Sequence, residues 1–369
     1  MKKIISSVVA VVMVFALACS ANLNAYAATF FTASTKTMLL TDNYKKDSIT
    51  STNLGGISVG TANNRVFAVK SNKDEKYATL YYYSNIYDSS YKASSNRKQP
   101  KRIVFKNGLL GHANAMAIDD NYVYVTMWQK DGNEKSKILK ISRKAVSELS
   151  DGTAVSSTSQ KTSNGTQICS SITPLTSSGA TYNRSIAAIS RFSYDKTNNI
   201  IKFVINYNYS SDRSQLTYTI ATYQNGKFVV SESPNDMFTV TNPYNADCVM
   251  QDIFYSPTYG LFIPMWYNVY TSGTRNTNKI LIADIETVKT NSSGTKLTFS
   301  PDKVVNVNGS TSSYNEYEIE SIAFVNRDSN KDSIEPKIVF SCNTLNKSDS
   351  GSDRIEMITN SSEILAWIS

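Results

Sequence analysis

The chain has 369 residues and a formal net charge of +8, and 41% of its residues are hydrophobic. That length suits one large repetitive domain or two ordinary ones. The basic residues are scattered and no nucleic-acid-reading motif accompanies them, so nucleic acid is not expected as a partner. A mild positive charge favours contact with anionic cell-wall polymers or membrane surfaces.

The first residues have the pattern of a secretory signal peptide. Lys2 and Lys3 precede an uncharged apolar run over residues 4–18, and the small-x-small sequence Ala25-Tyr26-Ala27 follows. We expect residues 1–27 to be removed, which lowers the net charge from +8 to +6 because two lysines are lost. No later stretch approaches the ~18 apolar residues of a membrane-spanning helix, so a secreted, extracellular chain is predicted.

The four cysteines leave two questions open. Cys19 lies in a loose lipobox, so a lipoprotein is the less favoured alternative to the cleaved leader. Cys169, Cys248 and Cys342 lie far apart without any C-x-x-C spacing, which argues against zinc. One disulfide with a leftover thiol and three buried thiols are both compatible with this pattern.

From residue 29 onward the composition is that of strands and turns. Val, Ile, Thr, Ser and aromatic residues dominate, and clusters of Gly, Asn, Asp and Ser interrupt them. Such residues suit pleated, half-buried strands joined by turns. Only residues 140–149 could form a short helix, so the predicted fold class is all-β.

One unit recurs along the chain, and its clearest copy lies at residues 111–128. Its two strands, residues 115–118 and 122–125, flank the polar turn Asp119-Asp120-Asn121 and form a β-hairpin. Equivalent hairpins start near residues 56, 115, 190, 251 and 320. Third strands are expected at residues 79–83, 137–141, 216–222, 279–285 and 354–358, and fourth strands at 102–105, 166–172, 227–231, 296–299 and 364–368.

Five units of four antiparallel strands predict a five-bladed β-propeller. A single unit cannot bury both faces of its sheet, whereas neighbours packed around a ring do so. Residues 28–369 are therefore expected to form a single domain, in which residues 28–54 add a strand to the last blade and close the ring. A pair of β-sandwiches, which the repeat disfavours, and another blade count are the alternatives.

Polar residues gather where the first strand of each blade would line the channel. Two aligned columns fall there: Gly55, Ala115, Ser190, Gln251 and Glu320, and next to them Gly56, Met116, Arg191, Asp252 and Ser321. Just upstream lie His112, Asn114, Arg184, Asn245, Asp247, Asn315, Glu316 and Glu318. From this set we predict the ligand-binding residues His112, Asn114, Arg184, Arg191, Gln251, Asp252, Glu318 and Glu320. The alternative is that such groups hydrogen-bond one another and water inside the channel.

A single histidine limits the chemistry. His112 has no G-x-S-x-G partner motif, which argues against a Ser-His-Asp triad, and one histidine excludes multi-histidine metal catalysis. Glycoside hydrolysis needs only two carboxyl groups with different pKa values, for which the candidates are Asp247, Asp252, Glu318 and Glu320. Enzymatic activity is the less favoured expectation.

The run Asp328-Ser329-Asn330-Lys331-Asp332 offers alternating oxygen ligands like the start of a calcium loop. Ser333 stands where the loop needs glycine, and Val339 stands where a bidentate glutamate would close it. A polar hairpin turn is therefore favoured, with calcium through Asp328, Asn330 and Asp332 as the weaker alternative. No other cofactor is expected.

The sequence Gly-His-Ala-Asn-x-Met at residues 111–116 resembles a motif of helveticin J-like proteins, which are large heat-labile bacteriocins. Gln251-Asp252-Ile253 and Glu318-Ile319-Glu320 are similar to blade starts in that group. Ala115 departs from the pattern, because an acidic residue is usual after the asparagine. The resemblance implies an exported antibacterial or envelope-binding propeller without an established catalytic activity.

Three functions follow as hypotheses. The first is a secreted propeller that binds a cell-surface glycan or wall polymer, with antibacterial activity as a bacteriocin. The second is a glycoside hydrolase that degrades a polysaccharide through the rim carboxylates. The third is an adhesion or scaffold module that binds another protein.

Overall fold

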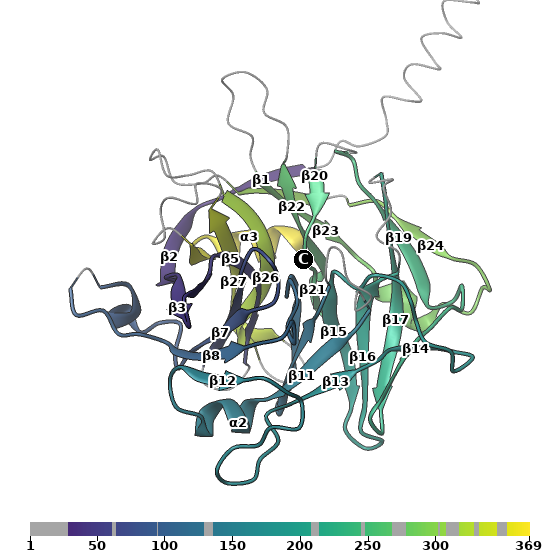
Figure 1. Cartoon of the computed structure of the whole chain (residues 1–369). Coiled ribbons are helices and arrows are strands. Elements are labelled where there is room, and N and C mark those ends of the chain that lie inside the picture. Colours follow the sequence, from purple (N-terminus) through teal and green to yellow (C-terminus); the bar gives the residue numbers. More distant parts are fainter. Residues whose placement is uncertain are drawn as a thin grey trace, which may run out of the picture.

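The computed structural model describes residues 29–60, 64–93, 95–128, 136–207, 214–244, 248–267, 278–301, 303–307, 317–327, 332–344 and 353–369. The predicted signal peptide, residues 1–27, lies outside this range. The described residues form an all-β structure, with 53% of them in strands and two α-helices, and the sheets have a propeller arrangement (Figure 1). No helix in the described ranges is long and apolar enough to cross a membrane.

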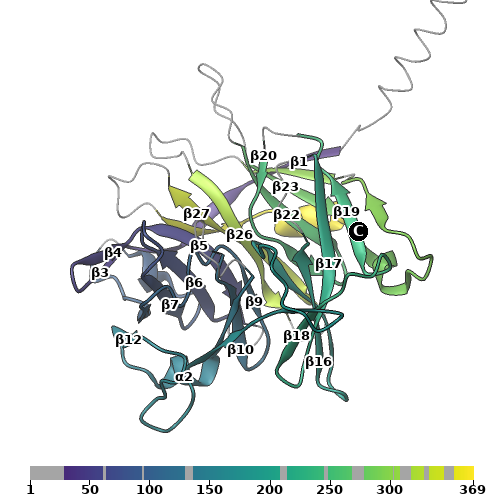
Figure 2. The same ribbon diagram turned by 45° about the vertical axis from the view of Figure 1, so that its right-hand side comes forward.

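The first two sheets come from the first half of the chain and are coloured purple to teal in Figure 2. The first contains β5 (Asn53–Val59), β6 (Val66–Ser71), β7 (Ala78–Tyr83), β8 (Lys101–Phe105) and β12 (Thr153–Val155). The second contains β9 (Met116–Ile118), β10 (Tyr122–Thr126), β11 (Ile138–Ser142) and β13 (Cys169–Ile172). A two-stranded hairpin of β3 (Tyr44–Lys46) and β4 (Ile49–Ser51) and the short helix α2 (Arg143–Glu148) accompany them.

Three further sheets complete the arrangement. The third contains β14 (Leu175–Thr176), β15 (Ile189–Asp195), β16 (Ile200–Asn206), β17 (Gln215–Gln224), β18 (Lys227–Val230), β19 (Met237–Thr241) and β24 (Leu297–Phe299). The fourth contains β1 (Thr29–Ala33), β20 (Cys248–Met250), β21 (Phe254–Ser256), β22 (Gly260–Tyr267), β23 (Asn278–Ala283) and β25 (Lys303–Val307). The fifth contains β2 (Thr35–Leu40), β26 (Tyr317–Arg327), β27 (Asp332–Thr344) and β28 (Arg354–Ile358), and helix α3 (Ser361–Ile368) follows it.

The predicted hairpins are present at all five starts. They correspond to β5–β6, β9–β10, β15–β16, β21–β22 and β26–β27, each paired antiparallel. The structure has four blades by blade count, rather than the five predicted. The described residues form five sheets of four or more strands, so the number of such sheets exceeds the number of blades by one.

The core lies between the sheets rather than within any one of them. Side chains alternate along each strand, so Val123 and Val125 of β10 face the first sheet while Tyr124 faces the third. Five buried apolar clusters arise in this way among the described residues. Each lies between two consecutive sheets, and the last of them packs Val339 of the fifth sheet with Ile57 of the first.

The start of the chain joins two sheets at the end of the chain. Strand β1 pairs in parallel with β25, and β2 pairs antiparallel with β28. Between these strands, the backbone N–H of Ser34 donates to Asn360 Oδ1 at 2.9 Å. The prediction that residues 28–54 add a strand to the last unit is therefore confirmed.

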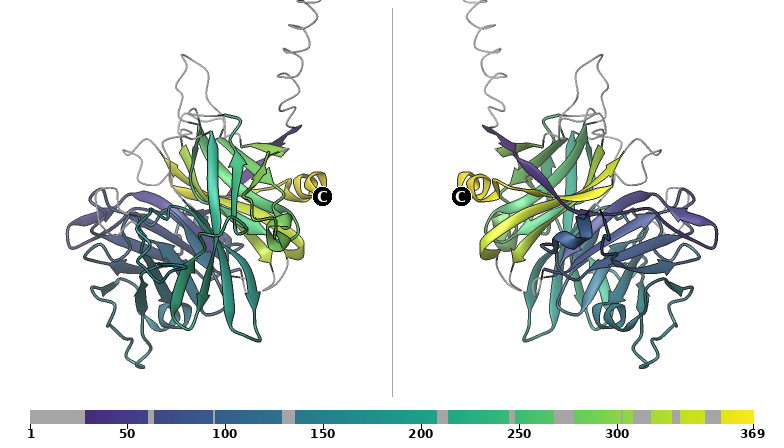
Figure 3. Two further views of the ribbon diagram at one scale, coloured as in Figure 1. Left: turned by 90° about the vertical axis from the view of Figure 1, so that its right-hand side faces the viewer. Right: turned by 90° about the vertical axis from the view of Figure 1, so that its left-hand side faces the viewer.

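Two predicted fourth strands are wrong. Residues 364–368 belong to helix α3, because β2 already occupies the free edge of β28; the helix buries Ile364 and Leu365 and lies beside β1 (Figure 3). Residues 296–299 form β24, which pairs with β19 of the third sheet. The corresponding strand of the fourth sheet is β25, which lies further along the chain.

The structure shows the state of two of the cysteines. Cys169 and Cys342 are buried free thiols, so neither forms a disulfide. Burial raises the pKa of Cys169 to about 11 and that of Cys342 well above its ordinary value, which keeps both thiols protonated and unreactive at neutral pH.

Candidate functional site

Asp252 lies at the centre of the arrangement and joins three sheets. Its carboxylate accepts hydrogen bonds from Met116 N at 3.4 Å, Ile189 N at 3.3 Å and Ser321 Oγ at 2.6 Å. The residue has 0% exposure, and burial raises its pKa to about 8. Because its acceptors are filled by the protein itself, Asp252 is a structural tie between the second, third and fifth sheets.

Glycines let the first sheet approach this centre closely. The N–H of Gly56 donates to Ala113 O at 2.9 Å, and a Cβ placed on Gly55 would lie 2.7 Å from the same carbonyl oxygen. Real side chains do not tolerate such a contact with backbone. The glycines therefore hold β5 against the segment that carries His112 and Asn114.

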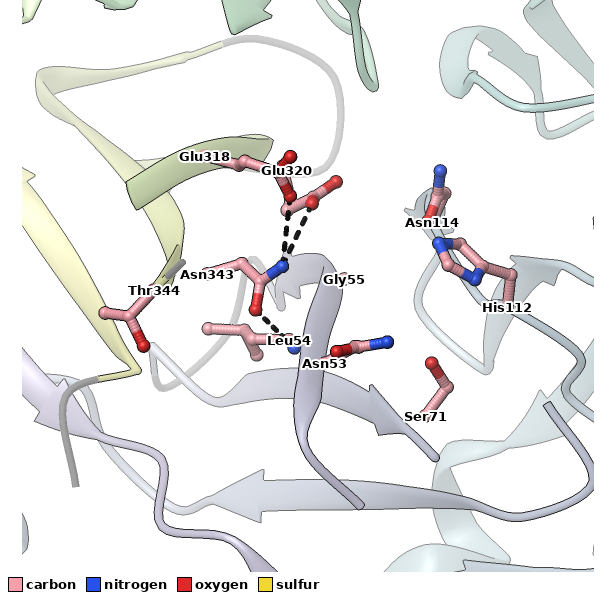
Figure 4. Close-up of a pocket in the computed structure, with 10 residues that line it drawn as sticks. All are labelled: Asn53, Leu54, Gly55, Ser71, His112, Asn114, Glu318, Glu320, Asn343 and Thr344. Carbon is pink, nitrogen blue, oxygen red and sulfur yellow. Dashed lines mark hydrogen bonds between the residues drawn. The ribbon is translucent and has the colours of Figure 1, made fainter. Parts of the chain in front are cut away.

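Directly beside these contacts lies a pocket of about 190 Å³, at the upstream ends of β5 and β26 (Figure 4). Its walls come from the first sheet, from the segment before β9 and from the fifth sheet. The described residues that line it are Asn53, Leu54, Gly55, Ser71, His112, Asn114, Glu318, Glu320, Asn343 and Thr344. Eight of these ten side chains are polar, and none of them is a lysine or an arginine.

Two glutamates form one wall of the pocket. Glu318 and Glu320 are two residues apart on β26, and their side chains lie on the same side of the strand (Figure 4). The amide of Asn343 on β27 joins them, since its Nδ2 donates to Glu318 Oε2 at 3.2 Å and to Glu320 Oε1 at 3.3 Å (Figure 4). Burial, followed by the neighbouring charge of Glu318, raises the pKa of Glu320 well above its ordinary value. Both causes favour the protonated form of the Glu320 carboxyl group.

His112 and Asn114 lie across the pocket from this pair (Figure 4). His112 Nδ1 is 2.8 Å from Glu75 Oε1, and its ring meets the edge of Trp128 with centroids 5.3 Å apart. These two contacts fix the orientation of the imidazole. The carbonyl oxygen Oδ1 of Asn114 is buried and has no hydrogen-bond partner among the described residues.

The structure brings together four of the eight predicted ligand-binding residues: His112, Asn114, Glu318 and Glu320. The other four do not line the pocket. Asp252 is the central tie, Arg191 is buried, Gln251 is half-buried, and exposed Arg184 stacks over Tyr207 at 4.4 Å.

Several predicted polar residues cannot be placed. Asn245, Asp247, Asn315 and Glu316, together with Asp328 and Asn330 of the calcium alternative, lie outside the described residues. Asp332 begins β27, but its side chain is outside the description. Within the described part of the chain, no group of three or more His, Cys, Asp or Glu side chains could hold a metal ion.

Four polar lining residues, Asn53, Ser71, Asn343 and Thr344, were not predicted. The cross-strand register holds the signal that would have found one of them, because Asn343 pairs directly with the predicted residue Glu318. A residue opposite a candidate ligand on the neighbouring strand faces the same side of the sheet.

Behind Thr344, a buried ion pair supports the pocket wall. Lys70 Nζ lies 2.6 Å from Asp353 Oδ2, and Asp353 Oδ1 accepts hydrogen bonds from Thr344 N at 2.9 Å and Thr344 Oγ1 at 2.7 Å. Because the ammonium of Lys70 is paired with Asp353, its charge is not offered to the pocket.

A larger cavity of about 350 Å³ lies at the β21–β22 turn. Tyr259, Asp284 and Lys303 are among its lining residues. Lys303 Nζ there donates to the backbone carbonyl of Ile368. This cavity contains none of the residues predicted to bind a ligand.

No family model and no curated protein matches the chain. Similar solved structures include an exo-β-1,3-galactanase from Phanerochaete chrysosporium with β-1,3-galactotriose (11% identity, TM-score 0.42, 89% of this chain and 66% of that one). A lignostilbene dioxygenase from Pseudomonas brassicacearum (8%, 0.31, 84% and 63%) and the Dos1 propeller (10%, 0.31, 82% and 56%) are also similar. The chain thus spans less than two thirds of the length of each, and such low identities carry no information on activity.

Proposed function

We propose that this chain is an exported five-bladed propeller that binds a glycan of a cell surface or wall through the pocket beside Glu318 and Glu320. The blade count is supported by the five apolar clusters, each of which lies between consecutive sheets. Export is supported by the leader-like residues 1–27.

One observation carries the binding proposal: carboxyl, amide, hydroxyl and imidazole groups from two sheets and from the segment before β9 converge on one small pocket. Sugar hydroxyls both donate and accept hydrogen bonds, so they suit carboxyl groups alongside amides such as Asn343 and Asn114. The volume of about 190 Å³ is below the roughly 300–1,000 Å³ of sites for drug-sized ligands. A single sugar unit at a chain end or branch therefore fits better than a long segment.

The geometry argues against glycoside hydrolysis at this pocket. Retaining hydrolases separate their two carboxyl groups by about 5–5.5 Å, and inverting ones by about 6.5–9.5 Å. Glu318 and Glu320 instead stand on one wall, where Glu318 Oε2 and Glu320 Oε1 both accept from Asn343 Nδ2, so they cannot flank a glycosidic bond from opposite sides. Asp252 cannot replace either residue, because it is fully buried in the central network.

The test is binding of the chain without residues 1–27 to a glycan array and to isolated cell walls. Asn343→Ala should lose most of the binding, since it removes the amide that joins both carboxyl groups. Glu363→Gln, an exposed acid on α3, is the matched control and should bind like wild type. Binding that is unchanged in Asn343→Ala would exclude this pocket, and no binding to any glycan would favour a protein-binding module. No reducing sugar should be released.

We further propose, on the resemblance of residues 111–116 to helveticin J-like proteins, that glycan binding serves an antibacterial activity. Growth inhibition of bacteria by the purified chain tests this. Inhibition by wild type that is lost in Asn343→Ala would support the link between pocket and activity. Equal inhibition by both would separate the antibacterial activity from the pocket.

A further inference from the structure

We propose that the pocket selects a sugar that carries a free amino group, whose ammonium donates hydrogen bonds to both Glu318 and Glu320. This inference rests on the proposed glycan binding and names the ligand class. It runs against the positive net charge of the whole chain, which by itself favours anionic polymers.

The first argument is the closeness of the two carboxyl groups, since Glu318 Oε2 and Glu320 Oε1 lie 3.2 and 3.3 Å from the same nitrogen atom, Asn343 Nδ2. Two carboxylates cannot both remain ionised in contact unless a positive charge or a proton lies between them. Among the described residues, the donor shared by both is the neutral amide of Asn343. An ammonium has three N–H donors and a full positive charge, so it satisfies both carboxylates at once.

The second argument is the excess of acceptors around the pair. Asn114 Oδ1, in the opposite wall, is buried without a hydrogen-bond partner among the described residues, which leaves it available to a donor. Asn343 Oδ1 is already used, since it accepts from Leu54 N at 3.3 Å. The pocket therefore suits a donor-rich, positively charged group, and it disfavours phosphate or carboxylate.

The third argument concerns the charged groups that surround Glu320. On its own strand it faces Glu318, and from the adjoining strands it faces Asn343 and the negative charge of Asp353. Asp353 is paired with Lys70, and His112 on the far wall is paired with Glu75. No described lysine or arginine lines the pocket to neutralise the pair. Entry of an ammonium therefore requires Glu320 to release its proton to solvent, so binding is coupled to proton release.

The experiment is titration calorimetry of the chain without residues 1–27 against two probes, a glucosamine oligosaccharide and its fully N-acetylated counterpart. We expect the amine form to bind roughly 10- to 100-fold more tightly, because each carboxylate gains a charge-assisted hydrogen bond. Repeating the titration in buffers of different ionisation enthalpy should show release of about one proton for the amine form and none for the acetylated form.

Two variants sharpen the test. Glu320→Gln should abolish the proton release and most of the preference for the amine, while binding of the acetylated form changes little. If Glu320→Gln does not fold, half-buried Glu318→Gln serves instead and should also lose the preference.

The outcomes separate the two proposals. Equal affinity for both probes without proton release would overturn amine selection and leave glycan binding in place. Binding of other glycans on the array, but of neither probe, would do the same. Calcium binding that depends on Glu320, with no binding of the amino sugar, would replace the amine by a metal ion. If the chain bound no glycan at all, both proposals would be overturned.

Discussion

Two buried carboxyl groups can be compared: Glu320 on β26, and Asp252 in the segment between β20 and β21. Asp252 and Glu320 are neighbours, since Asp252 N donates to Glu320 O at 3.2 Å, and burial raises the pKa of both side chains. Asp252 is surrounded by donors from three other strands. Glu320 accepts from one amide, which it shares with a second acid, Glu318, and it lines a cavity. Burial of an acid is therefore a poor sign of function until its donors have been counted.

The difference between them follows from strand alternation. In the aligned repeat Glu320 belongs to one column and Asp252 to the next, so their side chains leave the inner strands in opposite directions. The column of Asp252 also contains Met116 and Ser321, and both of these donate to its carboxylate. In the column of Glu320, Gly55 and Glu320 line the pocket. A shift of one residue separates a structural tie from a binding group.

The largest expected effect is that of Asp252→Ala on stability. It leaves the N–H groups of Met116 and Ile189 and the hydroxyl of Ser321 without their acceptor, which costs on the order of 3–5 kcal/mol of unfolding free energy. Urea denaturation at pH 6 measures it. Asp252→Asn is the control and should cost about 1 kcal/mol or less, because it resembles the protonated acid. A loss below about 1 kcal/mol in Asp252→Ala would show that the central network is dispensable.

The next effect is the pH dependence of stability. The folded pKa of Asp252 is about 8, above its ordinary 3.8, so the folded state binds the proton more tightly than the unfolded state. Its contribution is fully present below about pH 4 and is lost as pH rises towards 8, at roughly 1 kcal/mol per pH unit. The raised pKa of Glu320 acts in the same direction. Denaturation at pH 5 and pH 7 should show the fall, and Asp252→Asn should show a smaller one. A fall of the same size in the variant would remove Asp252 as its source.

A smaller effect is expected from Gly55→Ala, which tests how the rim is positioned. The new Cβ would meet the backbone oxygen of Ala113 at 2.7 Å, so the segment before β9 must shift at a cost of about 1–3 kcal/mol. Glycan affinity should fall with it, since that segment carries His112 and Asn114. In the control Gly60→Ala the Cβ would meet Arg143 Nη2, the far end of a side chain that can move. Equal effects of both variants would contradict the positioning role.

The smallest expected effect is that of Glu75→Ala on binding. The variant frees the imidazole of His112 from its 2.8 Å contact, which should weaken glycan binding roughly 3- to 10-fold. Stability should change little, because His112 is partly exposed. Glu75→Gln keeps a hydrogen-bonding partner and should restore most of the affinity. Titration calorimetry of wild type and the two variants measures the affinities. Equal affinities would show that the contact of Glu75 with His112 does not contribute to binding.

The strands could be predicted from the sequence because turn residues and alternating side chains act between residues that are close in the chain. In the turn at residues 119–121, Asp119 Oδ1 accepts from Asn121 N at 2.7 Å and from Tyr122 N at 2.6 Å, as its composition suggests. Four members of the rim set meet at one pocket for the same reason, since each lies just before or within the inner strand of its unit. The prediction of a shared rim needed only the repeat.

What could not be predicted depends on partners distant in sequence. The contact of Asn343 with both glutamates follows from the pairing of β26 with β27, whose register shifts between Ile319 and Ile322. The helix at residues 361–368 replaces a strand because β2, from the other end of the chain, occupies the edge. The role of Asp252 as a tie required the donors of three other sheets.

The pairing of the first strands with the last has a consequence for how the chain is made. Ser34 and Asn360 are hydrogen-bonded although 326 residues separate them. During synthesis from the N-terminus, β1 and β2 therefore remain without these partners until β25 and β28 have been synthesised. Contacts of such long sequence separation form slowly. An incomplete chain keeps two unpaired strands, and in that state it is most open to proteases and to pairing with other chains.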